Sequence, residues 1–137
     1  MNILYNLLKE NVELYNNFLD LEYKKYGAVL NSDINLLDDI VSQEQAYYLK
    51  MRVLEQKREK TLKDLGLSDK TLKEIIVLSD DEQKTQLNEI YDRLNILIND
   101  VKKINNLCKT LIEIRLHKVD KEMNKLGEKG KCLDQLF

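Results

Sequence analysis

The chain has 137 residues, no proline, two cysteines and a net charge of -2, with 22 lysines and arginines against 24 aspartates and glutamates. The two signs of charge are interleaved and form no basic face, which argues against nucleic acid as a partner. Charges also interrupt every window of about 20 residues, which argues against membrane insertion. Cys108 and Cys132 are not spaced as CxxC, and no leader pattern opens the chain, so we expect free thiols and a cytoplasmic location.

Apolar side chains recur every three or four residues almost from end to end, which is the spacing of amphipathic helices. Proline, which breaks helix interiors, is absent. The sequence therefore predicts an all-α fold, an elongated antiparallel three-helix bundle or coiled coil that forms a single domain over residues 1–137. We expect helices over 3–30, 34–65, 69–78 (a short connector) and 80–126, followed by a flexible tail over 127–137.

The helices over 3–30 and 34–65 are expected to form a hairpin. Short polar side chains at Asn31, Ser32 and Asp33 favour a turn, and Asp33 or Ser32 can cap the second helix. Gly66 can take the left-handed conformation that closes this helix, with Leu67 as the apolar contact that accompanies it.

Antiparallel pairing about this turn predicts which residues meet across the hairpin. It predicts the pairs Tyr15 with Tyr48, Val12 with Met51 and Leu8 with Leu54, and an aromatic layer of Phe18 with Tyr47. Glu44 and Arg58 occupy seam positions of the second helix where apolar residues would be expected, and we interpret both as side chains that reach the bundle surface.

Two serines are expected to start the remaining helices. Ser68 is the predicted cap of the connector, and Ser79 with Glu82 has the spacing of a capping box at the start of the last helix. That helix carries three neighbouring apolar rows, which predicts a bundle member that touches two partners.

The last helix is too long for its partners. At 1.5 Å per residue it spans about 70 Å, whereas the helix over 3–30 spans about 42 Å, so it should pass the hairpin turn near Arg115. Beyond that level an apolar stripe continues with no neighbour in the chain to cover it: Ile112, Leu116, Val119, Met123 and Leu126. Such a stripe predicts a docking surface for a client helix, a second copy of the chain, or the chain's own end folded back through Leu133, Leu136 and Phe137.

Two segments resemble the FlgN family of flagellar export chaperones. The first is VLNSDINLLDDIVSQEQAYYLKMRVLEQKREKTLKDLGL over Val29–Leu67, with Asp33 after the turn, Leu54-Glu55 followed by Arg58, and Leu65-Gly66 at the end. The second is VKKINNLCKTLIE in the last helix, where Asn105 and Asn106 match the asparagines of the family's third helix. The resemblance covers about Leu4–Leu126, but many members carry a tyrosine followed by glycine near the tail, where this chain reads GEKGKCLDQLF.

The resemblance implies a cytoplasmic type III export chaperone for flagellum assembly. Such a protein binds the C-terminal regions of hook-filament junction (hook-associated) proteins, prevents their premature assembly, and delivers them to the flagellar export apparatus. In the family the client is held mainly by the C-terminal part, so Ile112, Leu116, Val119, Met123 and Leu126 become the expected client contacts. The alternative is a structural coiled-coil protein that forms a homo-oligomer through its C-terminal helix and has no export client.

An enzyme, a metal site and a cofactor are not expected. No glycine-rich phosphate loop, carboxylate pair or nucleophile-base spacing is present. His117 is the single histidine and lacks the Glu-x-x-His partners of di-metal bundles. Cys108 lies on an apolar row, which predicts a buried thiol.

Overall fold

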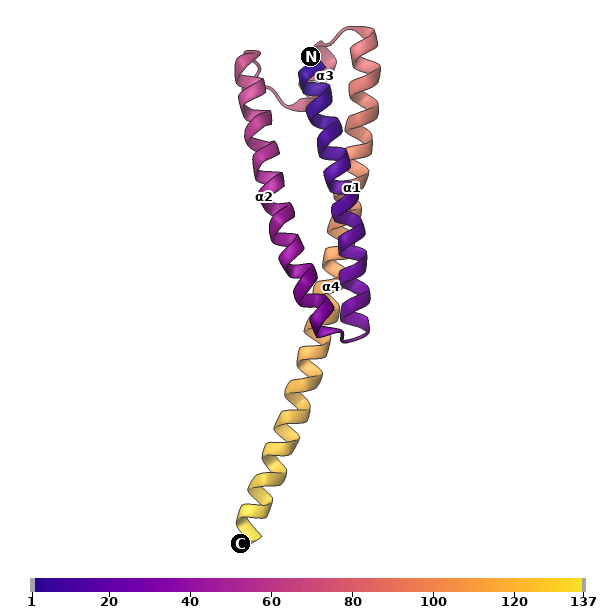
Figure 1. Ribbon diagram of the computed structural model, residues 1–137. Coiled ribbons are helices and arrows are strands. Elements are labelled where there is room, and N and C mark those ends of the chain that lie inside the picture. Colours follow the sequence, from indigo (N-terminus) through magenta and orange to yellow (C-terminus); the bar gives the residue numbers. More distant parts are fainter. Residues whose placement is uncertain (1, 137) are drawn as a thin grey trace.

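The computed structural model describes the backbone of residues 2–136 and the side chains of residues 3–127. Within this range it contains helices α1 (Asn2–Leu30), α2 (Ile34–Asp64), α3 (Leu72–Leu78) and α4 (Asp81–Leu136) and no strand, which confirms the predicted all-α fold. The three long helices lie along one direction and α3 sits near the N-terminal end of α1, while α4 extends far past the other end of the bundle (Figure 1).

The hairpin between α1 and α2 is closed by backbone and side-chain capping. Ser32 adopts a φ of 53°, and the N–H groups of Ser32 and Asp33 donate to the carbonyls of Val29 and Ala28, which is the Schellman arrangement. Asp33 then caps α2, because its Oδ1 accepts the Leu36 N–H at 3.1 Å. The predicted turn and its Asp33 cap are confirmed.

The end of α2 is also as predicted. Gly66 has a φ of 70°, and its N–H and that of Leu67 donate to the carbonyls of Lys63 and Leu62. Leu67 packs against the same core cluster that contains Leu62, which supplies the apolar contact of the motif.

The caps predicted at Ser68 and at Ser79 with Glu82 are wrong. Helix α3 begins at Leu72, because the Thr71 hydroxyl accepts the Glu74 N–H at 3.2 Å. Ser79 instead ends α3, since its Oγ donates to the Ile75 carbonyl at 2.8 Å. Asp80 caps α4 through its Oδ1, which accepts the Gln83 N–H at 2.8 Å; its carboxylate lies one residue closer to the helix than the serine hydroxyl.

The predicted end of the last helix at Leu126 is also wrong, because α4 continues through Gly127 as far as Leu136. A single glycine in a helix costs only about 1 kcal/mol relative to alanine, and no proline or capping side chain follows it to stop the helix. The flexibility predicted for 127–137 concerns a segment whose side chains, from Glu128 onward, lie outside the described residues. Because residues 112–136 form one continuous helix, the chain does not turn back on itself there. The fold-back onto the stripe that was considered is therefore not formed.

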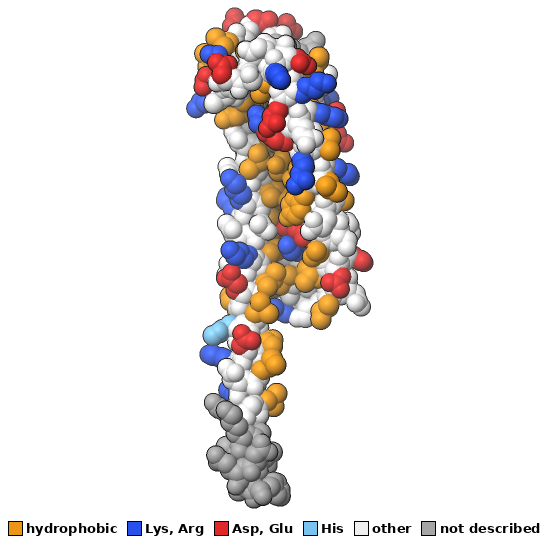
Figure 2. Space-filling model, turned by 90° about the vertical axis from the view of Figure 1, so that its left-hand side faces the viewer, with side chains coloured by type: hydrophobic (Ala, Val, Ile, Leu, Met, Phe, Trp, Pro, Cys, Tyr) orange, Lys and Arg blue, Asp and Glu red, His pale blue; other side chains and the backbone are white. Residues whose placement is uncertain are grey.

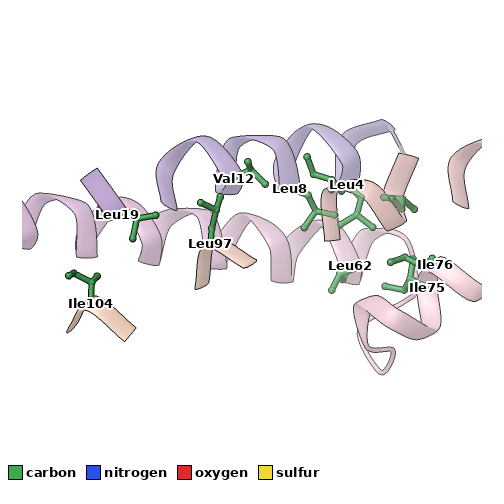
Figure 3. Packing of buried hydrophobic residues seen from close by; sticks show 11 residues of the cluster. Leu4, Leu8, Val12, Leu19, Leu62, Ile75, Ile76, Leu97 and Ile104 are labelled. Atoms are coloured by element: carbon green, nitrogen blue, oxygen red, sulfur yellow. The ribbon is translucent and has the colours of Figure 1, made fainter. Parts of the chain in front are cut away.

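Helix α1 is the centre of the bundle. It packs against both α2 and α4, whereas Cα atoms of α2 and α4 nowhere come within 8 Å of each other over residues 2–136. The larger core cluster joins one face of α1 to α4 and, near the start of α1, to Leu62 and α3 (Figure 3): Leu4, Leu8, Val12, Leu19, Leu62, Ile75, Ile76, Leu87, Ile90, Leu97 and Ile104. The last helix was predicted to touch two partners, and these are α1 and α3.

The face of α1 that meets α2 differs from the predicted one. Met51 and Leu54 of α2 pack against Leu7 and Leu14, whereas the predicted partners Leu8 and Val12 belong to the core that α1 forms with α4. The aromatic layer is confirmed, since the Phe18 ring lies 5.6 Å from the Tyr47 ring and 5.7 Å from the Tyr48 ring. The hairpin register is thus close to the predicted one, but α1 is rotated about its axis.

Candidate functional site

Helix α4 passes the hairpin turn at Arg115, the level predicted from helix lengths. The Arg115 guanidinium donates from Nη2 to the Leu30 carbonyl at 2.6 Å and from Nη1 to the Ser32 hydroxyl. A cation at the carbonyl end of α1 also satisfies the helix dipole. Arg115 therefore ties α4 to the hairpin turn at the level where α4 leaves the bundle.

Beyond Arg115 the predicted stripe is uncovered in the monomer. Leu116, Met123 and Leu126 expose 60%, 64% and 67% of their surface, Val119 is also exposed, and Ile112 at the root of the stripe is half-buried. Hydrophobic side chains lie along one side of this protruding segment, directly below the end of the bundle (Figure 2). We call residues 112–127 of α4 the overhang.

The root of the stripe opens into a crevice of about 320 Å³ under the hairpin turn. Its walls join the last turn of α1, the first turn of α2 and the overhang: Ala28, Val29, Ser32, Asp33, Ile34, Leu37, Ile112, Arg115, Leu116 and Val119. Ile34 and Leu37 were missed by the sequence reasoning. The signal in the sequence was Ile34, a large apolar residue directly after the N-cap of α2. Its side chain is 71% exposed in the structure.

Charged side chains border the stripe on both sides. At 100° per residue, Glu113 and Asp120 lie along one edge and Arg115 and Glu122 along the other, with Lys118 and Lys125 farther round the helix. An apolar centre with charged edges and a closed upper end is the form of a groove that receives an amphipathic helix.

A buried polar cluster lies inside the bundle, above the crevice. The Lys25 Nζ of α1 forms an ion pair with Glu44 Oε2 of α2 at 3.1 Å, and Glu44 is buried. The interpretation of Glu44 as a surface-reaching side chain is therefore wrong, because Lys25 compensates its charge in place. Arg58 does reach the surface, where it pairs with Glu55.

Glu22 completes this cluster and is only 1% exposed. Neither of its carboxyl oxygens has a hydrogen-bond partner among the described residues. Burial raises the pKa of Glu22 to about 8, the neighbouring Glu44 carboxylate raises it further, and Lys25 opposes the rise. At neutral pH Glu22 is therefore mostly protonated and uncharged.

Two further groups face the same cluster. Burial raises the pKa of Tyr48 on α2, with a further contribution from Glu44. Burial likewise raises the pKa of Cys108 on α4, whose Sγ lies 4.0 Å from the Glu22 carbonyl oxygen. The predicted buried thiol at Cys108 is confirmed, and the raised pKa makes it a poor nucleophile.

Comparison with known families places the chain. The model of the family described as FlgN protein matches residues 1–131. The chain belongs to the FlgN family. FlgN proteins are flagellar export chaperones, a class with no known enzymatic activity that binds flagellar export substrates. No curated protein and no solved structure matches the chain. No helix in the described part of this FlgN protein is long and apolar enough to cross a bilayer.

Proposed function

We propose that this FlgN protein holds the C-terminal region of a hook-associated protein as an amphipathic helix laid on the overhang and delivers it to the flagellar export apparatus. The observation that carries the proposal is the uncovered stripe of α4 together with the apolar crevice at its root. Covering each large apolar side chain of such a stripe is worth roughly 1.5 to 3 kcal/mol, which offsets part of the entropy cost of association.

The hairpin turn limits what can lie on the stripe. The crevice walls show that the stripe faces the side of α4 on which α1 and α2 lie. A second copy aligned parallel to the first would drive its own α4 into that hairpin. A short client helix ends below the hairpin turn and meets no such obstacle, which favours a client over a parallel dimer through the C-terminal helix.

The test is co-purification of a hook-associated protein with the variant Leu116→Asp/Met123→Asp. Two buried aspartates in the complex should reduce client binding at least about a hundredfold, because each adds a desolvated charge to an apolar interface. The melting of the bundle should stay close to that of the wild type, since both side chains are already in water.

Ile114→Asp is the matched control. Ile114 is 59% exposed and lies on the same helix as Leu116, but on the opposite side from the stripe. It should leave client binding unchanged. Equal loss of binding in both variants, or retained binding in the double variant, would contradict the proposal. A tail-to-tail dimer that the double variant abolishes, with no client bound by the wild type, would favour the structural coiled-coil alternative.

A further inference from the structure

A second groove lies between α1 and α2, on the opposite side of α1 from α4. It has a volume of about 470 Å³ and an apolar floor of Leu14 and Leu54. Asn17, on its α1 side, lies nine residues from Leu8, which packs in the core that α1 shares with α4. Nine residues are two and a half helical turns, so the groove opens away from α4.

Apolar side chains of α2 border this groove in water. Leu49 and Val53 are 62% and 49% exposed. A depression of about 320 Å³ continues the groove toward the start of α1, sharing Lys57 and adding Leu7 and Leu65. The apolar surface therefore extends over more than two turns of the hairpin, on a face that takes no part in the overhang.

The two lips of the groove carry opposite charge. Glu10 and Glu13 line it from α1, whereas Lys50 and Lys57 line it from α2. Among the described side chains, none of these four forms an ion pair. The Lys50 Nζ lies 5.2 Å from the centroid of the Tyr47 ring on its own helix. The groove thus presents an acidic lip and a basic lip whose charges no ion pair among the described side chains neutralises.

The charges on the two lips also lie at matching heights. The tilted rings of Phe18 and Tyr47 lie 5.6 Å apart, so residues whose numbers add up to about 65 are level along the hairpin. Lys50 lies two residues before the position of α2 that is level with Glu13. Lys57 lies two residues after the position that is level with Glu10. At 1.5 Å per residue, each acid lies within about 3 Å of the height of one lysine on the other lip.

We propose that two copies of this protein associate face to face through the α1–α2 groove, about a two-fold axis parallel to the helices. Such an axis places α1 of one copy against α2 of the other and preserves height, so Glu13 meets Lys50 and Glu10 meets Lys57 of the second copy. The same rotation covers Leu49 and Val53. A two-fold axis perpendicular to the helices would instead oppose acidic lip to acidic lip, which the charges disfavour.

This arrangement leaves the client surface free. Height is preserved between the copies, so both overhangs point in the same direction and each stripe stays uncovered by the other copy. Exposed charge pairs contribute little affinity but select orientation, so we expect a weak dimer whose dissociation constant rises with salt.

The experiment uses two charge variants of the full chain. Glu10→Lys/Glu13→Lys makes both lips basic, and Lys50→Glu/Lys57→Glu makes both lips acidic. Sedimentation velocity should show wild-type dimers at about 0.05 M salt that weaken at about 0.5 M. Each variant alone should lose at least about tenfold in dimer affinity, while an equimolar mixture should regain the wild-type affinity, because basic then faces acidic on both sides.

The mixture separates association between chains from charge effects within one chain. Circular dichroism should show the same helical content in all samples, since all four side chains are at the surface of the groove. A monomeric wild type at about 0.5 mM protein and low salt would overturn the proposal, as would a mixture no more dimeric than its components. A dimer that persists in both variants but is lost in Leu116→Asp/Met123→Asp would place self-association on the overhang and also overturn it.

Discussion

The bundled part of α4 and its overhang have the same spacing of apolar residues but opposite surroundings. Leu87, Leu97 and Ile104 are buried against α1, whereas Leu116 and Met123 project into water. The difference comes from the length of the neighbour, since α1 ends at Leu30 where Arg115 of α4 holds its last carbonyl. A heptad pattern therefore predicts an apolar surface that a partner must cover. Whether that partner belongs to the same chain depends on the lengths and positions of the neighbouring helices.

Shortening one leucine in the bundled part of α4 and one in the overhang should give the largest difference in stability between the two parts. Leu87 is 2% exposed, so Leu87→Ala leaves a cavity and should lower the free energy of unfolding by about 2 to 5 kcal/mol. Leu116→Ala removes side-chain atoms that are mostly in water and should change it by less than about 0.5 kcal/mol. Urea denaturation followed by circular dichroism measures both. Similar losses for the two variants would mean that the stripe is covered in the free protein.

A change of pH should alter the stability of the bundle through the buried Glu22, whereas the overhang should make no contribution to this dependence. Its folded pKa of about 8 lies above the ordinary value of 4.5, so between these values the folded chain binds more protons than the unfolded chain. Stability is therefore highest at acid pH and falls as pH rises toward about 8, by at most about 1.4 kcal/mol per pH unit. Glu22→Gln stays neutral and should be about 1 to 4 kcal/mol more stable than the wild type at pH 8.

The measurement is urea denaturation between about pH 5 and pH 9, where the wild-type slope should disappear in Glu22→Gln. Asp120→Asn makes the same chemical change on the overhang and should leave the slope intact, because its side chain is exposed in the folded chain too. Lys25, Glu44, Tyr48 and Cys108 remain around position 22 in both proteins. An unchanged slope in Glu22→Gln would show that another group of this cluster carries the titration.

Local signals in the sequence were enough for most of the fold. Asp33 and Gly66 act through their own backbone neighbourhood, so their roles could be predicted from residue type and position. The choice between Ser79 and Asp80 as the cap of α4 could not, because both can accept the same backbone donors and Ser79 is engaged by the preceding helix. The rotation of α1 was also hidden, since α1 has apolar residues on two faces and the partner of each face depends on how three helices pack.

The candidate site also has one part that the sequence could predict and one part that it could not. The stripe from Leu116 to Leu126 follows from the lengths of the helices, which a sequence reveals, and it is exposed in the structure. The crevice wall at Ile34 and the cluster around Glu22 come from contacts between segments far apart in the chain. From the sequence alone, Glu22 would be assigned to the surface of an amphipathic helix. Only the packing of α2 and α4 against α1 shows that it is buried.

Arg115 marks the boundary between the two parts of α4, and its removal should have only a small effect on stability. Arg115→Ala loses two surface hydrogen bonds to the end of α1, worth about 1 kcal/mol in all, while the apolar core above it is unchanged. Arg115→Lys keeps the positive charge but cannot hold the Leu30 carbonyl and the Ser32 hydroxyl with one planar group, so it should recover only part of that loss. Urea denaturation gives the stability, and amide hydrogen exchange should show faster exchange confined to the hairpin turn and the root of the overhang. Faster exchange throughout α1 would instead mean that Arg115 supports the whole bundle, and the boundary between covered and uncovered α4 would then lie elsewhere.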